Sequence, residues 1–357
     1  MILYLIGWKK TPVWQTKPQA ANFELSTKVS IIIPARNEEE NILNCLSSLY
    51  KQTYLLDNYE IIVVNDHSAD RTAEFVEKLD IPNLKLVSLS QSQSGKKKAI
   101  AEGVFQASGK LIITTDADCE MGEKWLSAIV SFYEKHKSKM IIAPVLLKDE
   151  KTFQDTFQSQ EMIALTACAG ASLYYNLPVL CSGANLVYEK ETFISINGFE
   201  GIEKTATGDD VFLMLKVHEK FPKQIHYLKS KEAAVFTHPE KKTITALNQR
   251  KRWASKTFFY GFSHVSLIAV LIFATNFLIL LSGILSVINL KFALALATSF
   301  SAKCIVDFML LHSASSFFGK RINPVSFFFA SILYPVYVSV IGLIAPFTTY
   351  SWKGRQS

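Results

Sequence analysis

Up to about residue 260 the chain alternates between short apolar runs and more polar, helix-like stretches. The apolar runs have the length and the β-branched content of buried strands. They predict strands at 29–34, 59–65, 84–89, 110–115, 140–147 and 180–187. Continuous apolar strands that alternate with helices are typical of a mostly parallel sheet covered on both faces. The pattern therefore predicts an α/β fold.

The stretches between the strands carry helix signals. Acidic residues follow Asn37 in the first turn of one expected helix, and Asp70 can cap another that runs to about Leu79. Asp209 begins a later helix, for which Thr207 is a possible cap. After the first two helices, the expected helices lie at 97–107, 123–136, 152–180 and 209–220.

Beyond residue 260 the alternation gives way to three long apolar stretches. They cover about 264–288, 292–311 and 325–346, and each reaches the roughly 20 residues that a helix needs to cross a bilayer. The second contains Lys303 and Asp307 on one helical face, so we expect these charges to pair or to face protein rather than lipid. The sequence therefore predicts a soluble domain followed by a membrane region of about three helices.

The segment 243–260 joins these two regions and mixes basic with aromatic residues. That combination is typical of a helix lying on a membrane surface. The positive-inside rule places its basic residues in the cytoplasm, together with Lys320 and Arg321 after two crossings. Because basic residues also follow the third crossing, either the tail is an exception to the rule or 292–311 does not fully cross.

The apolar start of the chain, Met1–Gly7, is too short to span a bilayer. It predicts either an interfacial anchor or a disordered end, and a linker with two prolines follows it. The expected domains are an N-terminal stub and linker at 1–27, a soluble α/β domain at 28–242, an interface helix at 243–262, a membrane region at 263–347 and a tail at 348–357.

Composition and charge narrow the choice of ligands. The 357 residues are 49% hydrophobic, carry a formal net charge of +7 and have a mean hydropathy of +0.18, which is high for a wholly soluble protein. Basic residues cluster around 95–98 and 250–256, which suits phosphates and anionic lipid head groups better than nucleic acid. The five cysteines form no CxxC pair, which favours reduced thiols over disulfides or a zinc site.

One apolar run ends in two carboxylates, Asp116 and Asp118. Side chains two residues apart on a strand point the same way, so both would emerge together at the carboxyl end of the strand 110–115. In open α/β sheets that edge binds ligands. Two oxygen donors there suit Mg²⁺ or Mn²⁺ and, through the metal, a diphosphate. Taken alone, an Asp-x-Asp is more often a polar turn that closes a strand.

Polar residues also follow the first two strands. The segment 34–38 (Pro-Ala-Arg-Asn-Glu) leaves the sheet after the first strand, and Asp66 ends the second. Asp66 is well placed to accept hydrogen bonds from a base or a ribose. Helix capping explains the first group equally well, and an Asx turn explains Asp66 equally well.

Two charged groups open helices. Gly95 is followed by three lysines, 96–98, at the positive end of a helix dipole, where a bound phosphate would stabilise them. A solvated charge run is the alternative explanation of these lysines. Asp209 and Asp210 lie in a first helical turn, where acidic residues are favourable without any ligand.

The order of these motifs resembles a known family. The motifs are VSIIIPARNEEENI (29–42), VVNDHSAD (63–70), GKKKA (95–99), TTDADC (114–119), GANLVYEKETFISINGF (183–199), TGDD (207–210) and QRKRW (249–253). Over about 28–262 they resemble membrane-bound family 2 glycosyltransferases of the processive type, such as cellulose, hyaluronan and poly-N-acetylglucosamine synthases, and ceramide glucosyltransferases. The resemblance implies a GT-A fold, which is a Rossmann-like nucleotide-sugar-binding domain, a UDP-sugar donor, and Mg²⁺ or Mn²⁺ as cofactor.

The resemblance also implies which residues bind the donor and the metal. The donor-binding residues would be Pro34, Arg36, Glu38, Asp66, Lys96, Lys97, Asp116, Gln249 and Arg252. Among them, Asp66 would bind the uridine, and Lys96 or Lys97 would lie near the uridine or the diphosphate. Asp118, together with Asp116, would hold the metal ion.

Two further positions concern the acceptor. Asp210 would be the general base that takes the acceptor's proton, and Trp253 of the QxxRW motif would stack on the acceptor. Asp209 stands where the family usually has the glutamate of Thr-Glu-Asp. The inserted Gly208 leaves the register open by one residue, so Asp209 is a second catalytic candidate.

The sequence therefore predicts an integral membrane glycosyltransferase with a cytoplasmic catalytic domain at 28–242. It would be inverting and metal-dependent, with a UDP-sugar donor, a lipid or lipid-linked saccharide acceptor, membrane lipids as neighbours and no nucleic-acid partner. Because polymer-extruding synthases carry more membrane helices, single transfer and processive polysaccharide synthesis both stay open. A non-catalytic membrane scaffold that kept the fold is an alternative of another class.

Overall fold

The computed structural model describes residues 1–16, 25–148, 150–202, 208–255, 260–261, 263–345, 351–352 and 355–356. The chain divides into two compact units. The first, here called the sheet unit, consists of Thr11–Lys148 and Cys181–His238. The second, here called the helical unit, consists of Met1–Lys10, Asp149–Leu180 and Pro239–Ser357.

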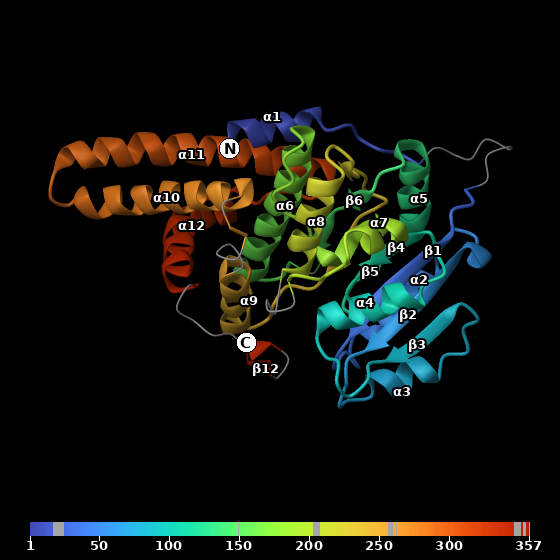
Figure 1. The fold of residues 1–357 in the computed structure, drawn as a ribbon. Coiled ribbons are helices and arrows are strands. Elements are labelled where there is room, and N and C mark those ends of the chain that lie inside the picture. Colours follow the sequence, from blue (N-terminus) through green and yellow to red (C-terminus); the bar gives the residue numbers. More distant parts are fainter. Residues whose placement is uncertain are drawn as a thin grey trace. The chain divides into compact units, whose positions relative to one another are not determined.

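The sheet unit contains a seven-stranded sheet with the strand order β3-β2-β1-β4-β8-β6-β9 (Figure 1). Its parallel half consists of β1 (Val29–Ala35), β2 (Tyr59–Asn65), β3 (Leu84–Ser88) and β4 (Leu111–Thr114). The other half consists of β8 (Leu186–Glu189), which is antiparallel to both neighbours, β6 (Met140–Ile142) and β9 (Ile225–Tyr227). Ile31, Ile32 and Ile33 of β1 are fully buried, as an apolar central strand requires. The predicted α/β class is confirmed.

Helices follow most of these strands. They are α2 (Ile42–Tyr50), α3 (Thr72–Glu77), α4 (Lys96–Gln106), α5 (Trp125–His136), α7 (Lys190–Ser195) and α8 (Asp209–Lys220), with single 3₁₀ turns at Leu56–Asn58 and Gly183–Asn185. Helix α4 packs on β1 and β2. A Cβ atom at Gly103 of α4 would lie 2.5 Å from Cγ2 of Ile32, so this close approach of helix and strand requires glycine.

A second, three-stranded sheet has the order β5-β10-β7 and consists of β5 (Glu120–Met121), β10 (Val235–Thr237) and β7 (Val145–Leu147). The prediction of one strand over 140–147 is wrong, because the chain leaves the large sheet after Ile142 and enters the small one at Val145. Pro144 lies between them and has no N–H to donate to a ladder. Its carbonyl oxygen instead accepts from the N–H of Val235, at 3.0 Å.

Two other elements begin at later residues than the sequence predicted. The helix expected from Asn37 begins at Ile42, because Asn37 adopts a positive φ of 53° that a right-handed helix does not allow. The strand expected over 180–187 begins at Leu186. The residues before it form a 3₁₀ turn, which the Ser182 hydroxyl caps.

The helical unit consists of α1 (Ile2–Lys10), α6 (Phe153–Tyr174), α9 (Thr243–Ser255), α10 (His264–Leu285), α11 (Leu290–Phe317) and α12 (Pro324–Ile344). Helices α10, α11 and α12 are long and apolar enough to cross a membrane, and α10 and α11 form a helical hairpin (Figure 1). They match the three apolar stretches predicted from the sequence. Lys303 and Asp307 of α11 form an ion pair with each other, which confirms the expected pairing. A short two-stranded sheet, β11 (Ser351–Trp352) with β12 (Arg355–Gln356), lies near the end of the chain.

The start of the chain is a helix, so of the two alternatives for Met1–Gly7 the disordered end is wrong, and the interfacial anchor stays a prediction. Trp8 of α1 is only 1% exposed, and its ring lies 5.7 Å from that of Phe317 and 6.0 Å from that of Phe318. A Cβ atom at Gly7 would lie 2.6 Å from the carbonyl oxygen of Ala171 in α6. Tight packing against α6 and α11 therefore holds α1.

Several boundaries differ from the predicted ones or are not tested. Helix α6 ends at Tyr174 rather than near residue 180, and α9 ends at Ser255. Residues 256–259, part of the expected linker at 17–24, and Thr207, the expected cap of α8, lie outside the described residues. The domain boundaries expected from the sequence stay a prediction.

Candidate active site

Asp116 and Asp118 lie at the carboxyl end of β4, as predicted. The backbone N–H of Thr115 donates to the Ile32 carbonyl of β1 at 3.2 Å, and that of Cys119 donates back to the Asp116 carbonyl at 3.1 Å. The first bond continues the pairing of the strands, and the second closes a tight turn. The two carboxylates thus leave the sheet within one turn, between β4 and β5.

Lys96, the first residue of α4, contacts the first of these carboxylates. Its ammonium group donates to Oδ1 of Asp116. Burial alone would lower the pKa of Lys96, but the carboxylates of Asp116, Asp209 and Asp210 outweigh it and raise that pKa above its ordinary value. Lys96 therefore stays charged and faces three acidic groups.

Gly183 lies at the centre of the same cluster. A Cβ atom there would lie 3.5 Å from Nζ of Lys96, 3.8 Å from Cβ of Asp210 and 3.9 Å from Oδ2 of Asp209. The 3₁₀ turn before β8 thus brings a backbone without a side chain up to the charged groups. The motif GANLVYEK contained this glycine, but its position beside Asp210 could not be read from the sequence.

Asp209 and Asp210 are the first two residues of α8. Gly208 before them has a φ of 87°, a conformation that favours glycine. Asp210 accepts the N–H of Gly183 on Oδ2 at 3.2 Å and the N–H of Val211 on Oδ1 at 2.8 Å. Asp209 is buried, with 8% of its surface exposed. The structure therefore brings both catalytic candidates to Lys96 and Asp116.

Asp118 has a partner that the sequence did not reveal. Its Oδ2 accepts from the hydroxyl of Thr237 in β10 at 3.2 Å, and its Oδ1 lies 3.6 Å from the thiol sulfur of Cys119. Strand β5 begins directly after this turn and pairs with β10. The small sheet therefore fixes the position of Asp118, through a strand more than a hundred residues away in the chain.

Asp66 and Arg36 form a second polar group, at the ends of β2 and β1. Asp66 is 3% exposed, and its Oδ2 accepts from the backbone N–H of Gly95 at 3.0 Å. Arg36 donates through Nη1 to the Asp66 carbonyl at 2.8 Å and lies 3.9 Å from its Oδ1. Because Gly95 precedes Lys96, this group adjoins the first cluster along the chain.

Pro34 lies within β1, where proline is normally excluded. The pairing of β1 with β4 ends at Ile32, so on that side Pro34 needs no N–H for the ladder. On the other side, Pro34 is aligned with Val64 of β2. Pro34 therefore marks the point where β1 and β4 part.

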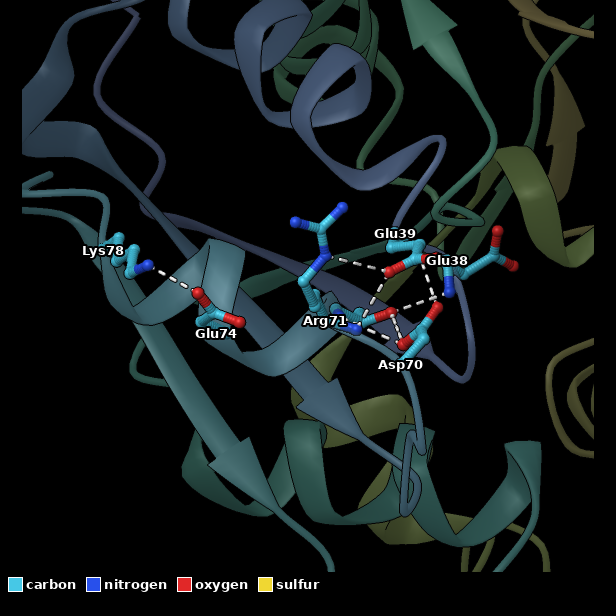
Figure 2. Close-up of polar contacts among 7 residues, drawn as sticks. Glu38, Glu39, Asp70, Arg71, Glu74 and Lys78 are labelled. Atoms are coloured by element: carbon cyan, nitrogen blue, oxygen red, sulfur yellow. Dashed lines mark hydrogen bonds and ion pairs between the residues drawn. The ribbon is translucent and has the colours of Figure 1, made fainter.

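Figure 2 shows how the loops after β1 and β2 are joined. Oδ2 of Asp70 accepts from the backbone N–H of Glu39 at 3.0 Å, and the N–H of Glu38 donates to the Thr72 hydroxyl at 2.7 Å. Burial raises the pKa of Asp70, but its hydrogen bonds with Thr72 and Glu39 outweigh burial and lower it. The carboxylate of Glu38 accepts from Asn41 at 2.9 Å. Asp70 is not the cap of α3 as predicted, because Arg71 occupies the N-cap position and the helix runs only from Thr72 to Glu77. Asp70 lies one residue earlier and accepts from the N–H of Thr72 at 3.0 Å.

Lys97 contacts a different part of the chain from Lys96. Its ammonium group donates to the carbonyl of Ile202. A cavity of about 730 Å³ opens beside this part of α4, and its walls include Gly95, Lys96, Lys97, Ala101, Phe193 and Phe199. Of the two lysines proposed for the donor, Lys96 is therefore the one that faces the acidic residues.

The acidic residues suit a divalent cation whose remaining ligands come from a bound substrate. Within the part of the chain that the structure describes, no group of three or more His, Cys, Asp and Glu side chains is gathered for a metal. Mg²⁺ is often bound by one or two carboxylates together with substrate phosphates. Asp116 and Asp118 provide two such carboxylates at one sheet edge.

Gln249, Arg252 and Trp253 belong to the helical unit and share helix α9. Oε1 of Gln249 accepts from Nη1 of Arg250, and Cζ of Arg250 lies 4.9 Å from the centre of the Trp253 ring. The carbonyl of Arg252 accepts from the hydroxyl of Ser255 at 3.1 Å. The helix thus holds the QxxRW residues together, with Arg250 between two of them.

Comparison with known proteins shows which family part of the chain resembles. Residues 30–206 match glycosyl transferase family 2. The probable glycosyltransferase YdaM of Bacillus subtilis is 26% identical over 70% of this chain and 59% of its own length. The undecaprenyl-phosphate 4-deoxy-4-formamido-L-arabinose transferase of Proteus mirabilis is 33% identical over 32% of this chain. The chain covers only 36% of that second relative.

One solved structure shows the fold. The mannosyltransferase PcManGT of Pyrobaculum calidifontis, in complex with GDP-Man and Mn²⁺, superposes with a TM-score of 0.58 at 18% sequence identity. The match covers 96% of this chain and 94% of that protein. The GT-A fold predicted from the motifs, followed by apolar C-terminal helices, is thus confirmed.

Proposed function

We propose, on the premise that residues 30–206 form a glycosyl transferase family 2 domain, that the protein is an inverting, metal-dependent glycosyltransferase. It would transfer a sugar from a UDP-sugar to a lipid or lipid-linked acceptor at the cytoplasmic face of the membrane. The observation that carries this proposal is the cluster of Lys96, Asp116, Asp209 and Asp210 around Gly183.

The cluster suits the displacement of a nucleoside diphosphate. In such a transfer the acceptor oxygen forms a bond to the anomeric carbon, and the bond from that carbon to the diphosphate breaks. The leaving UDP takes the electron pair, so negative charge grows on its phosphates. A divalent cation, when bound, supplies positive charge for these phosphates, and the charged Lys96 would add to it.

Asp210 is our candidate for the general base. Each of its oxygens accepts one backbone N–H, from Gly183 or Val211, and these bonds fix the plane of the carboxylate. An ionised carboxylate accepts hydrogen bonds, so Asp210 would accept the acceptor hydroxyl and take its proton. One base on the face opposite the leaving group would invert the anomeric centre.

Two groups of residues are proposed to bind the donor. Asp66, held by Gly95 and Arg36, would bind the uridine, with Pro34 and Glu38 in the same loop region. Asp118 and Asp116 would hold Mg²⁺ or Mn²⁺. The roles of Gln249 and Arg252 at the diphosphate and of Trp253 at the acceptor rest on the resemblance of QxxRW alone.

A lipid or lipid-linked acceptor is supported by two observations. Three apolar helices follow the sheet unit in sequence, and each is long enough to cross a membrane. The Proteus mirabilis relative is named for transfer involving undecaprenyl phosphate, which is a lipid. The basic residues of α9, together with Lys320 and Arg321, support a cytoplasmic catalytic domain.

A panel of UDP-sugars and GDP-mannose tests the proposal. The full-length protein in nanodiscs would be assayed for nucleotide release and labelled product, with Mn²⁺, with Mg²⁺ and with chelator. Membrane lipid extract and undecaprenyl phosphate would serve as acceptors. We expect transfer of a single sugar from one UDP-sugar to a lipid-soluble product. Long products would show a processive synthase instead, and no nucleotide release with any pair would favour the non-catalytic scaffold.

A further inference from the structure

We propose that Glu161 of α6 and Arg250 of α9 are positioning residues that orient the QxxRW segment on its helix. Neither belongs to the motif itself, because Arg250 occupies its first variable position and Glu161 lies on another helix. This inference rests on the proposed function, since it concerns residues that we assign to the donor and the acceptor.

The two residues form a buried ion pair. Nε and Nη2 of Arg250 donate to Oε2 of Glu161 at 2.8 and 2.7 Å. The side chains are 7% and 9% exposed, so water hardly competes for these bonds. Removing one partner from a buried pair leaves a charge that nothing compensates, which makes this contact sensitive to single substitutions.

The second oxygen of Glu161 reaches a third helix. Its Oε1 accepts from the hydroxyl of Tyr337 in α12, at 3.2 Å. The ring of Phe157, one turn before Glu161 in α6, lies 5.6 Å from the ring of Tyr337 in an edge-to-face contact. One carboxylate therefore joins α6, α9 and α12, so the rotation of α9 about its axis is tied to a predicted membrane helix.

Arg250 connects Glu161 to the residues of the motif through its own contacts. Its guanidinium carbon lies 4.9 Å from the centre of the Trp253 ring, within the range of a cation–π contact. Its Nη1 donates to Oε1 of Gln249. Because the guanidinium is planar and rigid, fixing it on Glu161 fixes the groups that lie against it. Arg250 therefore orients Trp253 and, together with Glu240, whose Oε1 accepts from Nε2 of Gln249 at 3.5 Å, it holds Gln249.

The segment that leads into α9 is attached to α6 by bonds that do not involve Arg250 or Glu161. The backbone of Glu240 accepts from Gln154 and Gln158 of α6 at 2.8 and 3.0 Å, and the hydroxyl of Thr243 donates to Gln154 at 2.7 Å. These bonds hold the start of the helix without touching Trp253. Substitution of Glu161 should thus misorient the motif without detaching the helix.

The test compares Glu161→Gln with the conservative Glu161→Asp and with a matched control, Glu150→Gln. Glu150 belongs to the same unit and forms an ion pair with Lys320, but it does not touch α9 in the described contacts. Each full-length variant would be assayed in nanodiscs for the KM of the UDP-sugar, the KM of undecaprenyl phosphate and kcat. Emission of Trp253 would be isolated by subtracting the same variant carrying Trp253→Phe.

We expect Glu161→Gln to raise the KM of the acceptor about tenfold and to shift the emission of Trp253, with a smaller rise in the KM of the UDP-sugar through Gln249. Glu161→Asp should recover part of these effects, and Glu150→Gln should show none of them. Unchanged emission and acceptor KM in Glu161→Gln would overturn the inference, as would equal losses in Glu150→Gln.

The emission readout keeps this inference separate from the proposed function. If the wild-type protein transfers no sugar, the proposed function fails, but the coupling of Glu161 to Trp253 is still decided by fluorescence. If Glu161→Gln does not fold, Glu161→Asp and Arg250→Lys carry the same comparison. In that case wild-type emission from Trp253 in both variants would overturn the positioning role.

Discussion

The ammonium group of Lys96 donates to Oδ1 of Asp116, so a cation of the chain itself faces the first carboxylate of the Asp-x-Asp pair. The second, Asp118, instead accepts from the neutral hydroxyl of Thr237. The two carboxylates therefore differ in these hydrogen-bond partners. Because two cations repel each other at short range, this difference supports our assignment of the divalent ion chiefly to Asp118.

Replacing Lys96 by Met should weaken nucleotide binding most strongly when no divalent ion is present. The change leaves Asp116, Asp209 and Asp210 without their balancing charge. In the presence of a chelator we expect UDP to bind about 10- to 100-fold more weakly, because this factor corresponds to the loss of one charge-assisted hydrogen bond. With Mn²⁺ present, the loss of UDP affinity should be smaller. Calorimetric titration with UDP measures this. Lys98→Met, an exposed lysine of the same helix, is the control. Equal losses in both variants would indicate a general charge effect.

Replacing Asp210 by Asn should slow transfer by about 10²- to 10⁴-fold, the range of general-base catalysis, and leave UDP binding nearly unchanged. The amide keeps the size of the side chain but cannot take a proton at neutral pH. Initial rates and UDP titration of the same preparation measure both effects. Glu219→Gln, near the end of α8, is the matched acid-to-amide control. If Asp209→Asn transfers sugar more slowly than Asp210→Asn, the general base is Asp209 and the motif is aligned one residue earlier.

Replacing Thr237 by Val should weaken metal binding although Thr237 is not proposed as a ligand. Loss of its hydroxyl frees the Asp118 carboxylate to rotate, and outer-shell partners of this kind are worth about 10- to 100-fold in metal affinity. Mn²⁺ titration in the presence of UDP, followed by electron paramagnetic resonance, measures the change. Asp118→Asn should lose more. Thr53→Val, at a surface position of the same unit, should bind Mn²⁺ like the wild type.

The edge of the sheet at β9 should loosen in mild acid. Burial, together with His136, lowers the pKa of His226 below its ordinary value of about 6.5. The folded state therefore prefers the neutral ring, so its stability is fully present above that value and is lost as the pH falls through the lowered pKa. The ring nitrogen Nδ1 lies 2.9 Å from the Ser138 hydroxyl.

The loss of local stability is measured by amide hydrogen exchange of β6 and β9, corrected for the intrinsic exchange rate at each pH. The measurements run from pH 7.5 to pH 5, which is about one unit or more on either side of the ordinary histidine pKa. Exchange should rise in the wild type and much less in His226→Gln. His238→Gln, in another part of the sheet unit, should behave like the wild type. A rise of equal size in His226→Gln would mean that other groups cause the acid sensitivity.

Local patterns in the sequence were sufficient for the parallel half of the sheet. Strands β1 and β2 are buried on both faces, so their central positions are continuously apolar and the run itself marks the strand. The same reasoning failed at 140–147, where one apolar run serves two sheets. Nothing in the run except Pro144 indicates the change, because both halves are equally buried.

The candidate site was predictable only where it follows strand ends. Asp66 and Asp116 could be identified because each follows an apolar run. Thr237, Gly183 and Glu161 could not, because their importance comes from contacts with residues far away in the sequence. Hydroxyls, glycines and single acids of this kind occur throughout the chain, and only the fold shows which of them face the site.

The helical unit is assembled from three separate stretches, and this has a consequence for the order in which the protein can form. Trp8 is synthesised long before Phe317 and Phe318, against which it packs. The sheet unit is complete in the nascent chain well before these aromatic partners exist. Helix α1 can pack on α6 as soon as Ala171 has been made, because Gly7 lies against that residue. Its contact with the end of α11 must wait for Phe317, so Trp8 is not fully covered before then.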